Sequence, residues 1–205
     1  MPPSSFSGGT KAKRAGLMAY NGMVRDSKAP ILRLAVSGKM RSGKDTLAER
    51  LVERYGFRRY AFADRLKEVA RELFAMPPGA KNRHLLVELG RKMCEVDKLV
   101  WVNYVLSQMP LRCDVVISDL RFKYEYYALK AFDFIVVRVD SDEVARLKRV
   151  ERFGSRVDLA LVDDPSETDL DGMEFDWVVD GTTYDSLYDG AAIMMKAMGR
   201  APAHG

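Results

Sequence analysis

The sequence predicts an α/β fold of three layers, in which helices cover both faces of a five-stranded parallel sheet. From Ile31 onward, short apolar runs alternate with longer amphipathic stretches, and the first apolar run leads through a glycine-rich turn into a helix. A length of 205 residues suits a single domain. We expect strands at Ile31–Val36, Arg59–Phe62, Asp114–Ser118, Phe134–Val139 and Asp176–Val179. We expect helices to begin near Gly43, Asp64 (as its own N-cap), Asn82, Lys123, Ser141 and Tyr184.

The two ends of the chain differ in composition from the part between them. Residues 1–30 are rich in Ser, Gly, Pro, Lys and Arg and show no periodicity, which predicts a flexible basic tail. We place the folded domain at residues 31–199 and a short C-terminal tail without a packing pattern at 200–205. Basic and acidic residues balance outside the N-terminal tail. Since nucleic-acid-binding proteins use a one-sided positive field, we expect no nucleic acid polymer as a partner.

Cysteine content and hydropathy indicate a cytoplasmic protein. Cys94 and Cys113 are too few for the disulfide framework of a small secreted domain and do not form a CxxC pair. No apolar run approaches the roughly 18 residues that cross a bilayer, and the N-terminus lacks a signal-peptide pattern. We expect no membrane partner, and either a monomer or a homodimer.

A phosphate-binding loop follows the first predicted strand. The segment from Gly38 to Thr46 has the pattern GxxxxGK between a strand and a helix. The glycines let backbone amides turn toward an anion, the helix N-terminus adds partial positive charge, and Lys44 reaches the terminal phosphates. The residues that we expect to bind ATP here are Gly38, Lys39, Met40, Arg41, Ser42, Gly43, Lys44, Asp45 and Thr46.

Two carboxylates near this loop are candidate ligands for Mg²⁺. Asp45 stands where the motif normally has the Ser or Thr that helps to hold the metal, and it could bind directly or through water. Asp119 follows the third strand, at the edge of the sheet where α/β proteins bind ligands. We therefore predict Mg²⁺ as cofactor, with Asp119 binding it through water; the alternative for Asp119 is a structural salt bridge with Arg121.

Basic residues at the same edge are candidates for a phosphorylated acceptor. Arg121 has the planar fork that clamps a phosphate. The helix after the second strand places Asp64, Arg65 and Lys67 beside the crevice. The alternative for these three is a solvated helix surface.

An arginine-rich lid is predicted at about 141–172. Such a lid can bring guanidinium groups onto a transferring phosphoryl group and exclude water from it. The alternative is a solvated basic helix. The basic side chains of this segment are Arg146, Lys148, Arg149, Arg152 and Arg156. The residues that we expect to be catalytic are Lys44, Asp119, Arg121 and Arg149.

Taken in order, four motifs resemble the phage-type deoxynucleoside monophosphate kinases: GKMRSGKDT, FADRLKE, ISDLRF and DDPSETDLDGMEFDWVVDG. The resemblance runs from about Ile31 to Met198 and is shared by the P-loop phosphomevalonate kinases of animals. It implies a P-loop kinase fold in which Arg146 and Arg149 belong to the lid. It also implies that Lys67 and Arg121 hold the acceptor phosphate. The residues it places against the adenine of ATP are Asp180, Gly181 and Thr182.

One position departs from the family pattern. Where relatives tend to have an Arg in the helix pattern GxxxRxxD, this chain has Cys94. Arg91 or Lys92 is the candidate to compensate, and we count Arg91 among the acceptor-binding residues. The departure puts the identity of the acceptor in doubt.

The resemblance implies that the γ-phosphoryl group of Mg-ATP passes to a nucleoside or deoxynucleoside monophosphate, giving ADP and a diphosphate. An anionic acceptor needs no general base. Alternatives that stay open are a dephospho-coenzyme A kinase, with Asp64 as base, and a phosphomevalonate kinase. A non-catalytic ATP-binding regulator is the alternative of another class.

Overall fold

The computed structural model describes residues 30–77, 79, 82–152 and 165–203. Backbone contacts divide the chain into Met1–Pro30 and Ile31–Gly205, and the fold lies in the second unit. The predicted basic tail up to residue 29 lies outside the described residues. So do residues 153–164 of the predicted lid, with Arg156.

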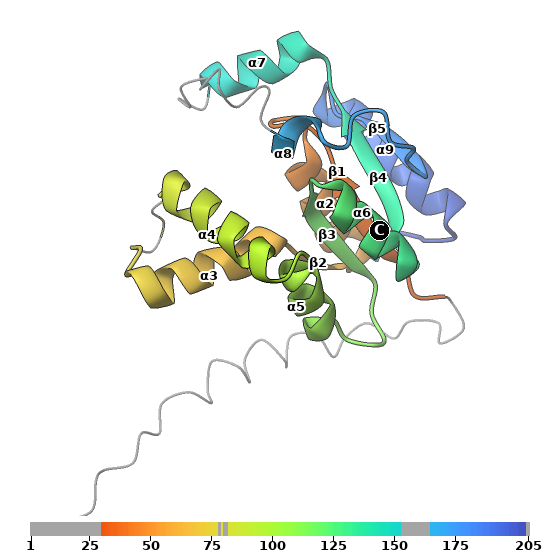
Figure 1. Cartoon of the computed structure of the whole chain (residues 1–205). Helices are drawn as coiled ribbons and strands as arrows, with labels where there is room; N and C mark the ends of the chain where they lie inside the picture. The colour runs from red at the N-terminus through yellow and green to blue at the C-terminus, as the bar shows by residue number, and fades with distance from the viewer. Residues whose placement is uncertain (1–29, 78, 80–81, 153–164, 204–205) are drawn as a thin grey trace, which may run out of the picture. The chain divides into compact units, whose positions relative to one another are not determined.

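A five-stranded parallel sheet in the order β2-β3-β1-β4-β5 forms the centre of the fold (Figure 1). Its strands are β1 (Arg33–Ser37), β2 (Arg58–Tyr60), β3 (Val115–Leu120), β4 (Ile135–Asp140) and β5 (Trp177–Asp180). The helices are α2 (Lys44–Tyr55), α3 (Phe62–Phe74), α4 (Arg83–Val96), α5 (Val100–Gln108), α6 (Lys123–Ala131), α7 (Glu143–Arg152), α8 (Pro165–Thr168) and α9 (Tyr184–Ala197). The predicted fold class is confirmed.

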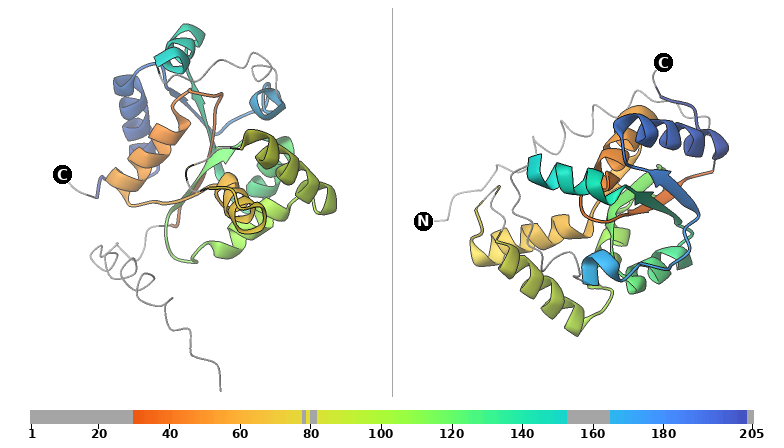
Figure 2. Two further views of the ribbon diagram at one scale, coloured as in Figure 1. Left: turned by 90° about the vertical axis from the view of Figure 1, so that its left-hand side faces the viewer. Right: turned by 90° about the horizontal axis from the view of Figure 1, so that it is seen from above.

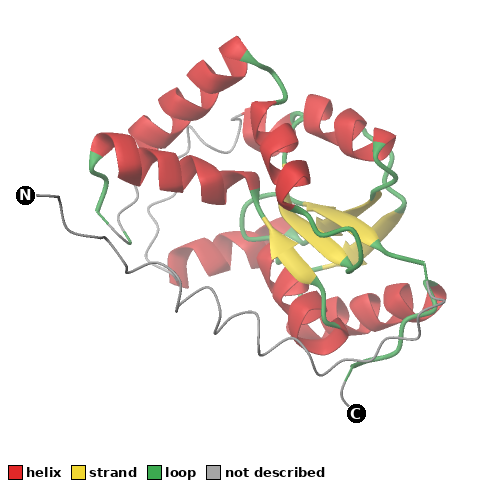
Figure 3. Cartoon of the chain, turned by 90° about the horizontal axis from the view of Figure 1, so that it is seen from below, coloured by secondary structure: helices red, strands yellow, loops and turns green. Residues whose placement is uncertain are grey.

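Helices cover both faces of the sheet, which explains why its strands are apolar on both sides. Figure 2 shows α2 and α9 on one face and α6 on the other, and Figure 3 shows helices on both sides of the sheet. The first core is formed by α2 and α9, with Leu47, Leu51, Leu187 and Met194. The second is formed by α5 and α6, with Trp101, Val102, Tyr126 and Leu129. No helix in the described part of the chain is long and apolar enough to cross a membrane.

The start of α3 differs from the prediction. The helix begins at Phe62, and its N-cap residue Ala61 makes no side-chain bond. The carboxylate of Asp119, on β3, instead accepts hydrogen bonds from the amides of Phe62 and Ala63, each at 2.9 Å. The prediction of Asp64 as the N-cap is therefore wrong, because the capping group comes from another part of the chain.

A separate helix, α5, was not predicted from the sequence. The helix expected from Asn82 is present as α4, and the Asn82 side chain caps it by accepting a hydrogen bond from the amide of Leu85 at 3.1 Å. A break at Asp97 follows, and α5 then buries Trp101 and Val105. Its apolar residues stand next to one another in the sequence, so a helical period is hard to see.

The C-terminal residues also contact the domain. Arg200 donates to the fully buried carboxylate of Asp114, with Nε 3.1 Å from Oδ2, and the amide of Leu32 donates to the same carboxylate at 2.8 Å. The amide of Ala203 donates to the carbonyl of Arg54 at 2.7 Å. A buried carboxylate needs such partners to offset its lost hydration. Arg200 and Ala203 are thus bonded to Asp114, just before β3, and to Arg54 in α2, where no packing was expected.

Replacing Arg200 with alanine should destabilise the fold. Removing one partner of a buried ion pair costs about 3 kcal/mol of unfolding free energy, because the carboxylate of Asp114 loses the cation that faces it. Urea unfolding of Arg200→Ala measures this. The control is Lys196→Ala, which removes an exposed positive charge at the end of α9. Equal stability of the two variants would contradict a stabilising role of the Arg200–Asp114 contact.

Candidate active site

The phosphate loop connects β1 to α2 and closes tightly on itself. A Cβ atom on Gly38 would lie 2.4 Å from Oγ of Ser42 and 2.6 Å from the carbonyl oxygen of Val139, so only glycine fits there. Lys44 begins α2 and is only 6% exposed. Burial, and then the positive charge of Arg121, lower the pKa of Lys44. An anion bound beside these two cations would relieve the repulsion between them.

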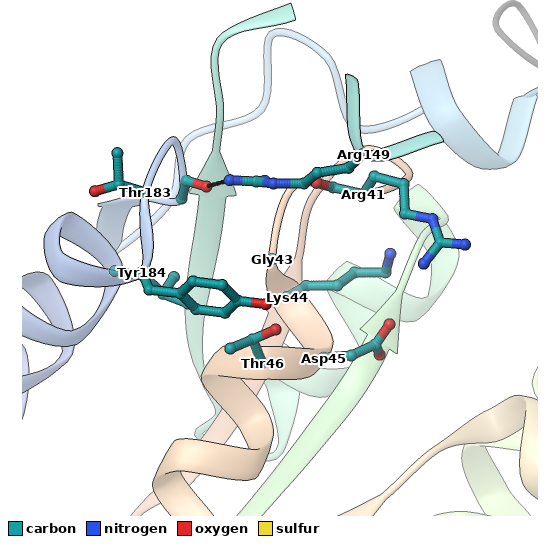
Figure 4. Close-up of a pocket in the computed structure, with 10 residues that line it drawn as sticks. Arg41, Gly43, Lys44, Asp45, Thr46, Arg149, Thr183 and Tyr184 are labelled. Atoms are coloured by element: carbon teal, nitrogen blue, oxygen red, sulfur yellow. Dashed lines mark hydrogen bonds between the residues drawn. The ribbon is translucent and has the colours of Figure 1, made fainter. Parts of the chain in front are cut away.

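A first pocket of about 160 Å³ lies over the helix end of this loop (Figure 4). It brings together residues from the loop, from α7 and from the connection between β5 and α9. These are Arg41, Gly43, Lys44, Asp45, Thr46, Arg149, Gly181, Thr183, Tyr184 and Leu187. Figure 4 shows Arg149 on one side of the pocket and Tyr184 and Thr46 on the other. Thr183 and Tyr184 were not predicted from the sequence, although they directly follow the segment expected at the adenine.

Arg149 ties three segments together at this pocket. Its Nη1 donates to the carbonyl of Arg41 at 2.8 Å, and its Nη2 donates to the carbonyls of Gly181 and Thr182 at 2.8 and 2.6 Å. These three acceptors are backbone carbonyls, so the guanidinium holds the loop and the β5–α9 connection beside each other; Nη1 also donates to Oγ of Ser141 at 3.4 Å. A direct catalytic role for Arg149 stays a prediction.

The β5–α9 connection lies directly against the phosphate loop. A Cβ atom on Gly181 would be 2.0 Å from the carbonyl oxygen of Ser42, so this close approach requires glycine. Beside it, the amide of Thr182 donates to the Asp180 carboxylate at 2.8 Å. Hydrogen bonds from Thr182 hold the pKa of Asp180 below its usual value. Asp180, Gly181 and Thr182 are therefore positioned next to the loop, and their contact with adenine stays a prediction.

A second pocket of about 590 Å³ lies between α3, α4, α5 and the end of β3. Its walls are largely apolar or aromatic, with Phe62, Leu66, Leu86, Val87, Trp101, Phe122 and Tyr124. The rings of Phe122 and Tyr124 are stacked with centroids 5.4 Å apart. Its cationic side chains are Lys67, Arg83, Arg91, Lys98 and Arg121. An apolar wall with a few charges suits a ligand that is part ring and part anion.

Arg121 stands at the second pocket and is bonded to Glu167, in α8. Its Nη1 lies 2.5 Å from Oε1 of Glu167 and 3.1 Å from the carbonyl of Ser166. The other oxygen of Glu167, Oε2, accepts a hydrogen bond from the amide of Met40 in the phosphate loop at 2.5 Å. Glu167 was not singled out from the sequence. Its only sequence signal was its place within the SETDLD stretch of the family resemblance.

The predicted acceptor residues are only partly brought together. Lys67 lines the second pocket and lies 3.5 Å from Asp64. Arg91 also lines it, but its guanidinium pairs with Glu88 at 2.8 Å and with Glu95. Arg65 is absent from the lining of either described pocket. Arg146, which was expected to bind ATP as part of the lid, is absent from both linings too. Arg65 pairs with Glu68 and lies over the ring of Tyr104.

The two candidate magnesium ligands differ in their surroundings. Asp45 lines the first pocket beside Lys44 and Thr46. Asp119 lines the second pocket, and both its oxygens already accept amides of α3. Burial raises the pKa of Asp119, against the opposing effect of those hydrogen bonds. Among the described residues no three His, Cys, Asp or Glu side chains gather into a metal site. Asp45 fits a Mg²⁺ ion that takes its other ligands from phosphates and water.

Glu125 is a buried carboxylate that holds the turn containing Arg121. Its Oε2 accepts hydrogen bonds from the amides of Arg121 at 2.9 Å and Phe122 at 3.0 Å. Burial raises the pKa of Glu125 to about 8, although these amides lower it. The folded protein therefore holds a proton there that the unfolded chain releases near pH 4.5, the ordinary value.

The stability of the protein should fall as the pH rises through this range. The contribution of the Glu125 proton is complete below about pH 4.5 and is lost as the pH passes the folded-state value of about 8. The unfolding free energy should fall by up to about 1.4 kcal/mol per pH unit in between. Glu125→Gln should flatten this slope, because the amide oxygen still accepts both hydrogen bonds but cannot ionise. Urea unfolding between pH 5 and 9 measures it, with the exposed Glu53→Gln as control. An unchanged slope in Glu125→Gln would contradict it.

Comparisons with known proteins agree with this arrangement. No protein-family model matches the chain. A protein of Acanthamoeba polyphaga mimivirus, named "Putative deoxynucleotide monophosphate kinase", is 25% identical over 146 residues, which cover 55% of this chain and 75% of the relative. The resemblance that the four motifs indicate is confirmed by this similarity.

Solved structures share the fold. TT1252 from Thermus thermophilus has a TM-score of 0.55 at 18% identity, covering 83% of this chain and 98% of its own. A gluconokinase from Sinorhizobium meliloti has 0.52 at 20% identity, covering 83% and 96%. Shikimate kinase from Acinetobacter baumannii has 0.51 at 17% identity, covering 82% and 94%. At these identities the similarity shows that the chain has the fold of P-loop kinases, and it says nothing of the acceptor.

Proposed function

We propose that this chain, which resembles the deoxynucleotide monophosphate kinases in its motifs and the P-loop kinases in its fold, transfers the γ-phosphoryl group of Mg-ATP to a nucleoside or deoxynucleoside monophosphate. The products are ADP and the nucleoside diphosphate. The observation that supports this most directly is the bridge made by Glu167 from the Met40 amide of the phosphate loop to Arg121, which lines the second pocket. A donor in the first pocket and an acceptor in the second would meet at this bridge.

The first pocket is the proposed ATP site. Loop amides and Lys44 bind the phosphates, as this motif does in other nucleotide-binding proteins. The adenine end lies against the β5–α9 connection, where Arg149 fixes Gly181 and Thr182. Asp45 would hold Mg²⁺, which when bound neutralises charge on the phosphate oxygens.

The second pocket is the proposed acceptor site. The stacked rings of Phe122 and Tyr124 and the side chain of Trp101 offer flat apolar surface for a nucleoside base. Phosphomevalonate has no ring and presents mostly polar groups, so this wall supports a nucleotide over it. Arg121 and Lys67 provide positive charge for the acceptor phosphate.

The chemistry would need positioning and charge neutralisation more than proton transfer. The attacking oxygen of a monophosphate is already anionic. Lys44 and Arg121, whose charge acts on Lys44, would stabilise the charge on the transferring group. A dephospho-coenzyme A kinase would instead need a base. Its candidate, Asp64, is engaged by Arg59 at 2.9 Å and by Lys67, which disfavours that reading.

The acceptor can be identified by measuring ADP release with Mg-ATP and a panel of acceptors. The panel holds ribo- and deoxynucleoside monophosphates, dephospho-coenzyme A and phosphomevalonate. We expect turnover with nucleoside monophosphates, and Lys44→Ala should lower kcat by about a hundredfold or more, because a charge that stabilises the transition state is lost. ATP binding without turnover on any acceptor would favour the regulator alternative. Turnover on another acceptor alone would overturn the nucleotide assignment.

The bonds made by Arg149 give a separate test of the donor site. A lysine ammonium cannot reproduce the planar fork that reaches the carbonyls of Arg41, Gly181 and Thr182. Arg149→Lys should therefore weaken ATP binding by about tenfold, since hydrogen bonds from a charged group are lost. Calorimetric titration with ATP measures this. The control is Arg152→Lys, an exposed arginine on the same helix. Equal ATP affinity in the two variants would contradict a role for Arg149 in the donor site.

A further inference from the structure

Glu167 makes two short contacts that join the proposed donor and acceptor sites. One oxygen accepts the Met40 amide and the other accepts Arg121, both at 2.5 Å. The Glu167 side chain is only 10% exposed, so it lies inside the structure rather than on a solvated surface. Its negative charge also acts on Lys44, whose pKa it raises against the effect of burial.

Two neighbouring carboxylates, Asp169 and Asp171, anchor this segment through partners other than Met40 and Arg121. Asp169 accepts the amide of Lys123 at 2.7 Å. Asp171 pairs with Lys39, in the phosphate loop, at 3.1 Å, and with Arg138 at 3.1 Å. The segment that carries Glu167 thus has anchors other than Glu167 itself.

The two donors that Glu167 occupies are of the kind that bind phosphate. A loop amide and a guanidinium beside a buried lysine form a typical anion-binding arrangement. A carboxylate and a phosphoryl group both accept hydrogen bonds through negatively charged oxygens. Met40 belongs to the phosphate loop and Arg121 lines the second pocket, so the two donors come from the proposed donor and acceptor sides. Two anions so close to each other would also repel strongly in a partly buried site.

We propose that the carboxylate of Glu167 and the transferring phosphoryl group compete for the Met40 amide and the Arg121 guanidinium. This inference rests on the proposed function for the identity of the phosphoryl group. Binding of ATP then requires Glu167 to leave both donors, which frees Arg121 for the reaction. The bridge lowers the affinity for the γ-phosphate and leaves the β-phosphate, held by the helix end of the loop, nearly unaffected.

The test compares ATP and ADP binding to the full chain and to Glu167→Gln by calorimetric titration. Glutamine keeps the size of the side chain and can still accept the Met40 amide, but it removes the negative charge. We expect ATP affinity to rise on the order of tenfold while ADP affinity stays nearly constant. The ratio of the two affinities is the decisive quantity, because a general loosening of the loop would change both.

The matched control is Asp169→Asn. It removes the same charge two residues away and does not touch the Met40 amide or Arg121. Long-range electrostatics should then raise ATP and ADP affinity only slightly in this variant. Thermal unfolding without ligand checks that both variants fold as the parent does.

Two results would contradict the proposed competition between Glu167 and the phosphoryl group. One is an ATP-to-ADP affinity ratio in Glu167→Gln equal to that of the parent, and the other is weaker ATP binding. Inorganic tripolyphosphate and pyrophosphate provide a second pair of probes with the same expected difference. If the parent binds neither nucleotide, the proposed function fails, and the polyphosphate pair still decides whether Glu167 competes for the anion site.

Discussion

The carboxylate of Asp119 connects the sheet to the helices that form the second pocket. Each of its oxygens accepts one of the two first amides of α3, groups that have no partner within a helix. The positive end of the helix stabilises the negative charge, which offsets part of the cost of burying it. Because Arg121 follows two residues later, the same strand end positions α3 and the proposed phosphate clamp. The wall that α3 contributes to the second pocket and the proposed phosphate clamp, Arg121, are therefore both positioned at the end of β3, where Asp119 lies.

Features whose interacting residues lie close together in the sequence could be predicted, and features that join distant parts of the sequence could not. The phosphate loop could be predicted because its turn, its lysine and its helix N-terminus lie within nine residues from Gly38 to Thr46. Glu167 could not, because its partner Met40 is 127 residues away and no local pattern marks the contact. The prediction of the α3 cap was wrong for the same reason. Asp64 has the position of a local cap, but the capping carboxylate is that of Asp119, 56 to 57 residues from the amides that it caps. The missed α5 is different: its neighbouring apolar residues conceal the helical period.

The charges at the junction of the two pockets are nearly balanced by the protein itself. Burial, and after it the positive charge of Arg121, lower the pKa of Lys44, and the negative charges of Asp45, Glu167 and Asp119 oppose that effect. Charges in such a partly buried place interact more strongly than they would in water. A bound nucleotide brings further negative charge to this balance. Under the proposed function, either a metal ion or the departure of a protein carboxylate would then compensate, and Asp45 and Glu167 are the candidates for these two roles.

If the second pocket binds the acceptor, as proposed, Cys94 makes recognition depend more on the shape of the acceptor and less on its charge. It lines the second pocket where relatives tend to have an arginine, and its Sγ lies 3.8 Å from the hydroxyl of Tyr124. Arg91 is a weak substitute, because Glu88 and Glu95 on its own helix already hold its guanidinium. The acceptor phosphate is then left mainly to Arg121 and Lys67. With less charge to hold the acceptor, discrimination between proposed acceptors would come from how the ring of the acceptor fits the apolar wall. In such a pocket, one added or missing substituent on the ligand changes its affinity only modestly. Under the proposed function, this pocket is expected to accept several nucleoside monophosphates.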